Sequence, residues 1–218
     1  MKKRTYFFVS FLLLAILSGV FITLEVTFNE EPILDRWTGP AVQGLDQTFL
    51  FFVFRWLTEL GSGTFLTPFT IVAALFLLLY TRDWLAALML ASGTLIGYRV
   101  NHWIKLAVER DRPRLFSAAE GVGYSFPSGH AMVSLIAYGL LIYFLLKYVK
   151  SQKAALFINV FGICLILLIG LSRYVIRVHY LTDVLGGYAF GFIFISIWIG
   201  FYHALQHFVK PKYRRLRL

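Results

Sequence analysis

Residues 172–205 read SRYVIRVHYLTDVLGGYAFGFIFISIWIGFYHAL, and this stretch decides the fold class. It begins with a polar cluster that contains Arg173, His179 and Asp183, and it continues into an apolar run over 184–205. An apolar run of about 20 residues is long enough for a helix to cross the hydrocarbon core of a bilayer. The stretch therefore predicts a membrane-spanning helix with ionisable residues at its entrance.

The rest of the chain shares this apolar character. Hydrophobic residues make up 59% of the 218 residues and charged residues only 15%, with a mean hydropathy of +0.72. A soluble domain of this length would expose too much apolar surface, so the composition favours a membrane protein. We expect an all-α fold, a six-transmembrane-helix bundle that forms one integral membrane domain over residues 1–218. The predicted spans are 6–24, 63–80, 84–104, 129–148, 155–171 and 184–205.

A shorter aromatic segment, residues 45–57, contains four phenylalanines and a tryptophan together with Asp46 and Arg55. It is too short to span a bilayer easily. Aromatic side chains on one face and charges on the other are typical of helices that lie in the membrane interface. We predict an interfacial amphipathic helix here.

The distribution of charge predicts the orientation of the chain. With the N-terminus placed in the cytoplasm, the inside segments hold 12 of the 21 basic residues but only one of the 11 acids, Asp83. Cytoplasmic loops are enriched in Lys and Arg, so both termini are expected to be cytoplasmic. The net charge of +10 then reflects membrane topology, and we expect membrane lipids rather than nucleic acid as partners. The sequence leaves the oligomeric state open.

Three polar clusters mark the ends of predicted spans. In this topology all three fall on the extracytoplasmic face, although the charge count does not require it. The clusters are Lys105 with Arg112-Pro113, Pro127-Ser128-Gly129-His130, and Ser172-Arg173 with His179 and Asp183.

The third cluster pairs a histidine with a carboxylate. His179 and Asp183 are four residues apart, so on a helical turn they share a face. The carboxylate can fix the imidazole tautomer and leave the other ring nitrogen available as a nucleophile. Arg173 can offer a forked donor to phosphate oxygens. The alternative is a structural His–Asp pair that caps the last span.

The second cluster begins a helix. The first turn of a helix presents N–H groups and the positive end of the helix dipole to an anion. Gly129 keeps this backbone accessible, Ser128 adds a hydroxyl donor, and His130 is expected beside the bound phosphate. An ordinary helix start with an interfacial histidine is the alternative.

The first cluster places basic residues on the outer face, where the positive-inside rule disfavours them. We assign Lys105 and Arg112 to phosphate binding. We expect Arg110 and Arg114 to contact lipid headgroups. Arg99 and His102, in the last turns of the predicted third span, are candidates either for contact with the substrate or for interfacial anchoring; the sequence does not decide between these roles.

Gly187 and Gly191 form a small-xxx-small pair directly after Asp183. Such a pair permits close approach between membrane helices. We therefore expect the last span to pack closely against a neighbouring helix and to hold the His179 turn rigid.

Lys-x6-Arg-Pro, Pro-Ser-Gly-His and Ser-Arg-x5-His-x3-Asp occur in this order over residues 105–183. The set resembles the three signature motifs of the type 2 phosphatidic acid phosphatase superfamily, and the predicted helix layout is similar to its bacterial membrane branch. The resemblance implies that His179 is a nucleophile that forms a phosphohistidine, that Asp183 orients it, and that His130 acts as general acid and then base. It further implies a phosphate-binding set without any metal or cofactor, made up of Lys105, Arg112, Ser128, Gly129 and Arg173.

The expected function is a metal-independent lipid phosphate phosphatase at the extracytoplasmic face of the cell membrane. The substrate we favour is phosphatidylglycerophosphate, which would give phosphatidylglycerol. Undecaprenyl diphosphate is the alternative, because the motif residues bind phosphate and do not indicate which lipid tail is attached to it. Two other classes remain open: a transporter with a proton relay, and an inactive scaffold that binds headgroups. Transporter sites usually lie near the bilayer midplane, whereas these clusters lie at span ends.

Overall fold

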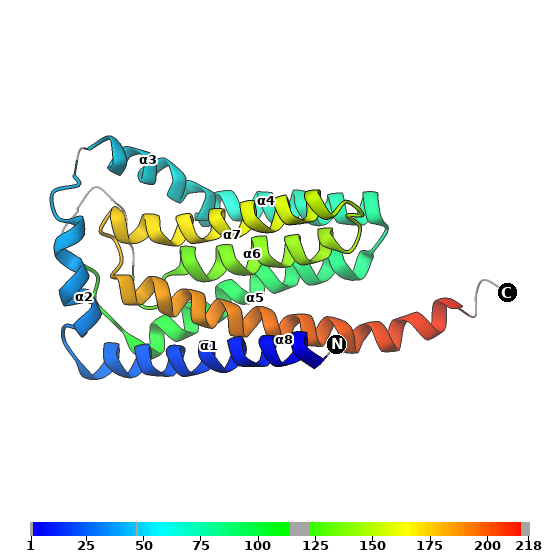
Figure 1. Cartoon of the computed structure of the whole chain (residues 1–218), viewed down its shortest axis with the longest axis horizontal. Coiled ribbons are helices and arrows are strands. Elements are labelled where there is room, and N and C mark those ends of the chain that lie inside the picture. The colour runs from blue at the N-terminus through cyan, green and yellow to red at the C-terminus, as the bar shows by residue number, and fades with distance from the viewer. Residues whose placement is uncertain (1, 47, 114–122, 215–218) are drawn as a thin grey trace.

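Six long helices run along a common direction and form an elongated bundle (Figure 1). The computed structural model describes residues 2–46, 48–113 and 123–214, with the side chains of residues 5–208 inside these ranges. The long helices are α1 Lys2–Phe28, α4 Gly63–Phe76, α5 Trp84–Val108, α6 Gly129–Leu146, α7 Gln152–Val175 and α8 Leu181–Arg214, and α4 continues as a π-helical turn over Leu77–Thr81.

Five helices in the described part of the chain are long and apolar enough to cross a membrane: Thr5–Phe28, Gly63–Thr81, Gly129–Leu146, Gln152–Val175 and Leu181–Phe208. They coincide with five of the six predicted spans. The remaining predicted span, residues 84–104, lies within α5, which packs against α4, α6 and α8. Its passage through the bilayer stays a prediction.

Polar side chains set the helix starts. Ser62, Asp83, Ser128 and Ser151 precede α4, α5, α6 and α7, and each side chain accepts a hydrogen bond from a backbone N–H of the first turn. Such caps satisfy donors that a helix cannot satisfy internally. The caps therefore mark where each of these helices begins.

Helix α6 lies at the centre of the bundle, where it packs against α5, α7 and α8. The predicted close contact of the last span is confirmed at Gly187 and Gly191 in α8. A Cβ added at Gly187 would lie 2.7 Å from the Ser128 carbonyl oxygen, and one at Gly191 would lie 3.1 Å from the Met132 carbonyl oxygen. The backbones of α6 and α8 therefore meet directly behind the motif residues.

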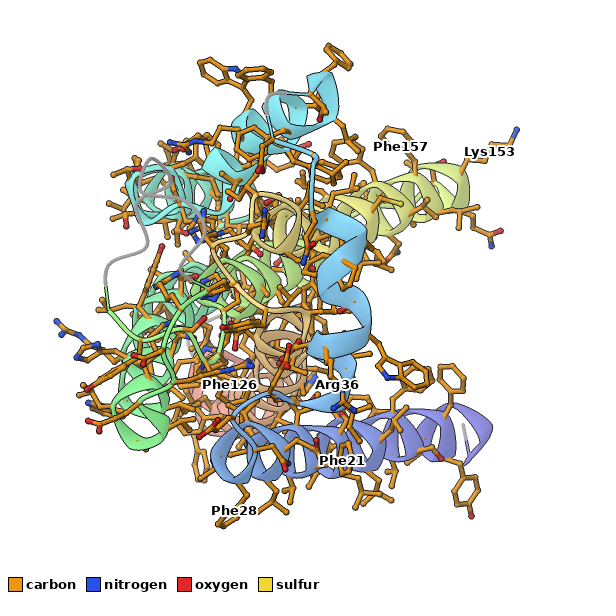
Figure 2. All side chains as sticks on the ribbon, turned by 90° about the vertical axis from the view of Figure 1, so that its left-hand side faces the viewer. Phe21, Phe28, Arg36, Phe126, Lys153 and Phe157 are labelled. Carbon is orange, nitrogen blue, oxygen red and sulfur yellow. The ribbon has the colours of Figure 1, made fainter. Side chains whose placement is uncertain are left out.

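The two ends of the bundle differ. The start of α1 and the end of α8 lie at one end, and two short helices, α2 Ile33–Thr38 and α3 Phe49–Leu57, lie at the other (Figure 1). Viewed onto this second end, α2 crosses the bundle from the end of α1 (Figure 2). A helix is thus present in the predicted segment, although it begins at Phe49, where Thr48 caps it; its position in the membrane interface stays a prediction. The sequence analysis did not predict α2.

Candidate active site

The three polar clusters converge at the end of the bundle that α2 crosses. Lys105 lies in the last turn of α5, His130 in the first turn of α6, and Arg173 in the last turn of α7, whereas His179 lies in the link before α8. Backbone hydrogen bonds connect the clusters: Ser128 N–H donates to the Asp183 carbonyl (2.9 Å), and Ser125 N–H donates to the Arg110 carbonyl (2.7 Å). Segments far apart in sequence therefore form one site.

The end of α7 places His179. The Arg173 carbonyl accepts hydrogen bonds from the N–H groups of Val178 (3.1 Å) and His179 (3.2 Å). The chain can reverse here because Arg177 adopts a left-handed conformation with φ of 59°, as commonly happens where a helix ends. The spacing of six residues between Arg173 and His179 is thus the length of a helix-terminating turn.

The predicted His–Asp pair is present. His179 Nδ1 lies 3.2 Å from Asp183 Oδ2, and both side chains are buried. A carboxylate at Nδ1 favours the tautomer with the proton on that nitrogen, which leaves a lone pair on Nε2. Burial lowers the pKa of His179 to about 3, although Asp183 opposes this shift. The imidazole is therefore neutral at physiological pH.

Asp183 is fixed by further donors. Oδ2 accepts hydrogen bonds from the Ser125 hydroxyl (2.5 Å) and the Tyr180 N–H (2.9 Å), and Oδ1 accepts one from Arg110 Nη1 (2.6 Å). A carboxylate with this many donors stays ionised and cannot rotate. Ser125, fully buried, was not singled out in the sequence, because it belongs to none of the three motifs.

The expectation that Arg110 contacts lipid headgroups is wrong. Its guanidinium is buried between two carboxylates, Asp183 (2.6 Å) and Asp35 in α2 (2.7 Å), and it stacks 4.0 Å from the Tyr180 ring. Burial opposes the charge, but the two carboxylates raise the pKa of Arg110 above its usual range. Asp35 also accepts hydrogen bonds from the N–H (3.0 Å) and hydroxyl (2.5 Å) of Thr182, which ties α2 to the start of α8.

Arg112 faces the other side of the imidazole. Its Nη1 lies 3.2 Å from His179 Nε2 and donates to the Val178 carbonyl (2.9 Å), while Nε donates to the Gly123 carbonyl (2.8 Å). Burial lowers the pKa of Arg112, only partly offset by the Asp183 charge. The guanidinium thus lies at the atom that the tautomer leaves nucleophilic.

Lys105 and Arg173 complete the cationic side of the site. Lys105 Nζ donates to the carbonyls of Tyr124 (2.6 Å) and Ser125 (3.1 Å). Arg173 is 7% exposed and donates from Nη1 to the Thr58 hydroxyl (3.0 Å), but its buried Nε has no hydrogen-bond partner among the described residues. A buried donor without a partner is costly, and an anion bound here would satisfy it.

His130 lies within electrostatic range of His179, Arg173, Arg112 and Lys105; its place beside a bound phosphate stays a prediction. The neighbouring Gly61 permits this position, because an added Cβ would lie 3.1 Å from His130 Cδ2. Ser128 is fully buried, and its hydroxyl caps α6 by accepting from Ala131 N–H (3.4 Å). Gly129 begins α6 beside Asn101.

The site carries unbalanced positive charge. Lys105, Arg110, Arg112 and Arg173 are cationic, whereas the buried carboxylates are those of Asp35 and Asp183. The adjoining Arg55–Glu59 and Arg177–Asp46 pairs are each balanced. Two net positive charges therefore remain among these groups, enough to neutralise a phosphomonoester dianion. A cavity of about 250 Å³ adjoins His179 and extends under α2, where Asp35 and Tyr180 contribute to its lining.

Some of the predicted residues stand apart. Arg99 and His102 are exposed on the outer surface of α5, which fits interfacial anchoring better than contact with the site. Arg114 lies outside the described residues. The place of Arg110 in the site could have been predicted from the sequence, because it lies two residues before Arg112. No sequence pattern indicated a role for Asp35.

Comparisons with known proteins agree with this geometry. The family model of the PAP2 superfamily matches residues 84–207. Phosphatidylglycerophosphatase B of Bacillus subtilis is 30% identical over 212 residues, which cover 95% of this chain and 98% of that protein. A thioesterase–phosphatase fusion of Schizosaccharomyces pombe, named palmitoyl-protein thioesterase-dolichyl pyrophosphate phosphatase fusion 1, is 29% identical over 147 residues, 66% of this chain and 23% of the fusion.

Among solved structures, the crystal structure of a transmembrane PAP2-type phosphatidylglycerolphosphate phosphatase from Bacillus subtilis superposes with a TM-score of 0.80. The two chains are 26% identical, and the match covers 87% of this chain and 94% of the other. The similarity therefore extends over almost the whole bundle and is not confined to the motif region.

Proposed function

Because the chain belongs to the PAP2 superfamily and is a multi-pass membrane phosphatase close to phosphatidylglycerophosphatase B, we propose that it hydrolyses phosphatidylglycerophosphate to phosphatidylglycerol and phosphate. The observation that carries phosphoryl transfer is the asymmetry around His179, whereas the choice of substrate rests on the similarity to phosphatidylglycerophosphatase B. One ring nitrogen is held by a fully bonded carboxylate, and the other faces a cluster with excess positive charge. This is the arrangement that nucleophilic phosphoryl transfer requires.

In the first step, the lone pair on His179 Nε2 attacks phosphorus and the bond from phosphorus to the lipid oxygen breaks. The bound phosphate dianion offsets the cations around His130, so that this imidazole carries a proton, and it gives that proton to the departing alkoxide as a phosphohistidine forms. The imidazole gains positive charge as it is phosphorylated, and the ionised Asp183 at Nδ1 stabilises that charge. The leaving group departs as phosphatidylglycerol.

In the second step, water attacks the phosphohistidine. His130, now neutral, takes a proton from this water, the phosphorus–nitrogen bond breaks, and inorganic phosphate leaves. The electron pair returns to Nε2. A single histidine thus serves as acid and then as base, which restores both imidazoles after one turnover.

The cations hold the transferring group. Lys105, Arg112 and Arg173 donate to the phosphoryl oxygens, and the unpartnered Nε of Arg173 becomes satisfied when the substrate binds. Arg112 exchanges its contact with Nε2 for a contact with a phosphoryl oxygen, so that substrate binding uncovers the nucleophile. Ser128 and Gly129 contribute at the start of α6 through its N–H groups and dipole. In this scheme the residues do not require a metal.

The reaction takes place at the extracytoplasmic face of the cell membrane. Two observations support this side: the excess of basic residues in the predicted cytoplasmic segments, and the position of the site at the bundle end opposite to the start of α1 and the end of α8 (Figure 1). The proposal includes six spans, with α5 as the sixth, and cytoplasmic termini.

Undecaprenyl diphosphate remains the second candidate substrate, because the S. pombe relative is named for a polyprenyl-type diphosphate. The test is phosphate release by the purified protein in detergent with EDTA present. Phosphatidylglycerophosphate, phosphatidic acid and undecaprenyl diphosphate are compared side by side. We expect the highest kcat/KM for phosphatidylglycerophosphate, with inhibition by vanadate. Proton or ion flux without phosphate release would contradict the proposal and favour a transporter.

A further inference from the structure

A second cavity, of about 260 Å³, lies between α4 and α5, and none of the motif residues lines it. Thr67 and Thr70 of α4 and Thr94 and Tyr98 of α5 contribute to its lining. Exposed apolar side chains such as Ile71 and Leu95 stand at its edge, so the cavity opens toward the surface that lipid covers. We call it the α4–α5 groove.

The groove holds two buried hydroxyls for which the described residues offer no hydrogen bond of normal geometry. Thr70 is 5% exposed, and its hydroxyl has no hydrogen-bond partner among the described residues. The Tyr98 hydroxyl is buried beside Thr67 and likewise forms no hydrogen bond of normal geometry in the described part of the chain. By contrast, the Thr94 hydroxyl donates to the Leu90 carbonyl (2.9 Å). Buried hydroxyls without partners are destabilising, so two of them in one groove indicate a ligand that accepts hydrogen bonds.

The groove begins next to the active site. An added Cβ at Gly63, the first residue of α4, would lie 3.4 Å from the Tyr98 hydroxyl, and one at Gly61 would lie 3.1 Å from His130 Cδ2. Thr70 follows Gly63 by seven residues, which is about 10 Å along the helix axis. The two hydroxyls therefore extend from the level of His130 into the apolar layer, in the direction that the tail of a bound lipid phosphate must take.

Few groups at this depth can accept a hydrogen bond. A helix carbonyl that is bonded within its helix can accept a second hydrogen bond from a hydroxyl, as Leu90 does from Thr94, but Thr70 and Tyr98 form no such bond among the described residues. A polyprenyl chain is a hydrocarbon and carries no oxygen beyond its diphosphate. A diacylglycerol carries two ester carbonyl oxygens just below its headgroup, and these accept hydrogen bonds without competing donors of their own.

We propose that the α4–α5 groove is a subsite for the diacylglycerol part of the substrate, in which Thr70 and Tyr98 donate hydrogen bonds to the ester carbonyls. This inference rests on the proposed function and narrows it, since it selects a glycerolipid phosphate over a polyprenyl diphosphate. The cations at the end of the bundle bind the phosphate, and the hydroxyls of Thr70 and Tyr98 select the lipid class.

The test compares phosphatidylglycerophosphate with its dialkyl ether analogue, which has the same headgroup and no carbonyls. The wild-type protein should show a KM for the ether lipid about tenfold or more above that for the ester lipid. Thr70→Val and Tyr98→Phe, both nearly isosteric, should each raise KM for the ester lipid about fivefold and leave KM for the ether lipid unchanged. Ser92→Ala is the control, because Ser92 also lies on α5 and its hydroxyl already donates to the Leu88 carbonyl.

Folding of each variant is checked by its kcat on a water-soluble aryl phosphate, which does not occupy the groove. Equal KM values for ester and ether lipids with the wild-type protein would overturn the inference without any variant. Equal increases in KM for both lipids in the variants would also overturn it. So would a variant that changes the oligomeric state while the ratio of the KM values for ester and ether lipid stays unchanged, because the groove would then be a contact between copies of the chain. Absence of phosphate release from every lipid phosphate would instead refute the proposed function.

Discussion

The two ends of the bundle each hold a cluster of charged and polar side chains, and they differ in how completely those groups satisfy one another. At the end away from the motifs, Asp83 accepts hydrogen bonds from Ala86 N–H (3.0 Å), Lys147 (3.3 Å) and Tyr148 (2.9 Å). One carboxylate faces one ammonium group. Burial opposes its ionisation, but these donors hold the pKa of Asp83 below its usual value.

At the motif end, four cations face two buried carboxylates, and the Nε of Arg173 lacks a partner among the described residues. Both clusters lie at helix ends and contain a buried or partly buried carboxylate bonded to a cation. Charge balance separates them: a balanced cluster stabilises the fold, and an unbalanced one retains charge for a ligand.

Removal of the nucleophile should give the largest effect. His179→Ala should abolish phosphate release, a loss of about 10⁴-fold or more in kcat, because no other group at the site can form the phosphoryl-enzyme. Asp183 keeps its bonds to Arg110, Ser125 and Tyr180, so the thermal midpoint should change little. Turnover at the wild-type rate would remove His179 from its role.

His130→Ala should lower kcat on the lipid substrate by about 10²- to 10⁴-fold, because the leaving alkoxide then lacks a proton donor. On an aryl phosphate, whose leaving group departs without a proton, formation of the phosphoryl-enzyme should be much less affected. The measurement is the pre-steady-state burst of the phenol. Equal losses of that burst and of lipid turnover would contradict the assignment of His130 as the acid.

Variants of Arg110 test whether the orientation of Asp183, which contacts His179 Nδ1, contributes to catalysis. Arg110→Ala should lower kcat by about 10- to 100-fold at nearly constant KM, because Arg110 orients Asp183 and does not contact phosphate. Arg110→Lys should recover only part of the loss, since one ammonium cannot bond both Asp35 and Asp183 as the guanidinium does. The matched variant Arg112→Lys should mainly raise KM. A rise in KM for the Arg110 variants would indicate that Arg110 binds substrate directly.

The smallest effect on activity is expected at the balanced cluster. Asp83→Asn should leave kcat and KM unchanged and lower stability by about 1 kcal/mol, since it weakens hydrogen bonds to Lys147 and Tyr148. Thermal unfolding in detergent measures the stability, and the lipid phosphatase assay measures kcat and KM. A loss of turnover in this folded variant would show that the two ends of the bundle are not independent.

Sequence patterns predicted the long helices because apolar length is a local property, and five of the predicted spans coincide with helices apolar enough to cross a membrane. The His179–Asp183 pair was predictable for the same reason, since both residues lie on one turn. Asp35 was not predictable, because its contact with Arg110 joins residues 75 positions apart and follows from the docking of α2.

Arg110 and Arg112 illustrate a different limit. They are two residues apart in one basic stretch, yet Arg110 bonds Asp183 and Arg112 faces the opposite nitrogen of His179. The chain leaves α5 at Glu109, which has a positive φ of 52°, and this turn decides where each arginine points. Helical spacing rules do not apply beyond that residue, so the sequence could assign both arginines only by charge.

The central claim, nucleophilic attack by His179 Nε2, is tested most directly by trapping the phosphoryl-enzyme. A ³²P-labelled aryl phosphate is mixed with the His130→Ala variant, in which water activation is impaired, and the reaction is quenched in base after less than one turnover. We predict an acid-labile, base-stable label on the peptide that contains His179. A label on any other residue, or phosphate release in a single turnover without a labelled protein, would contradict the account.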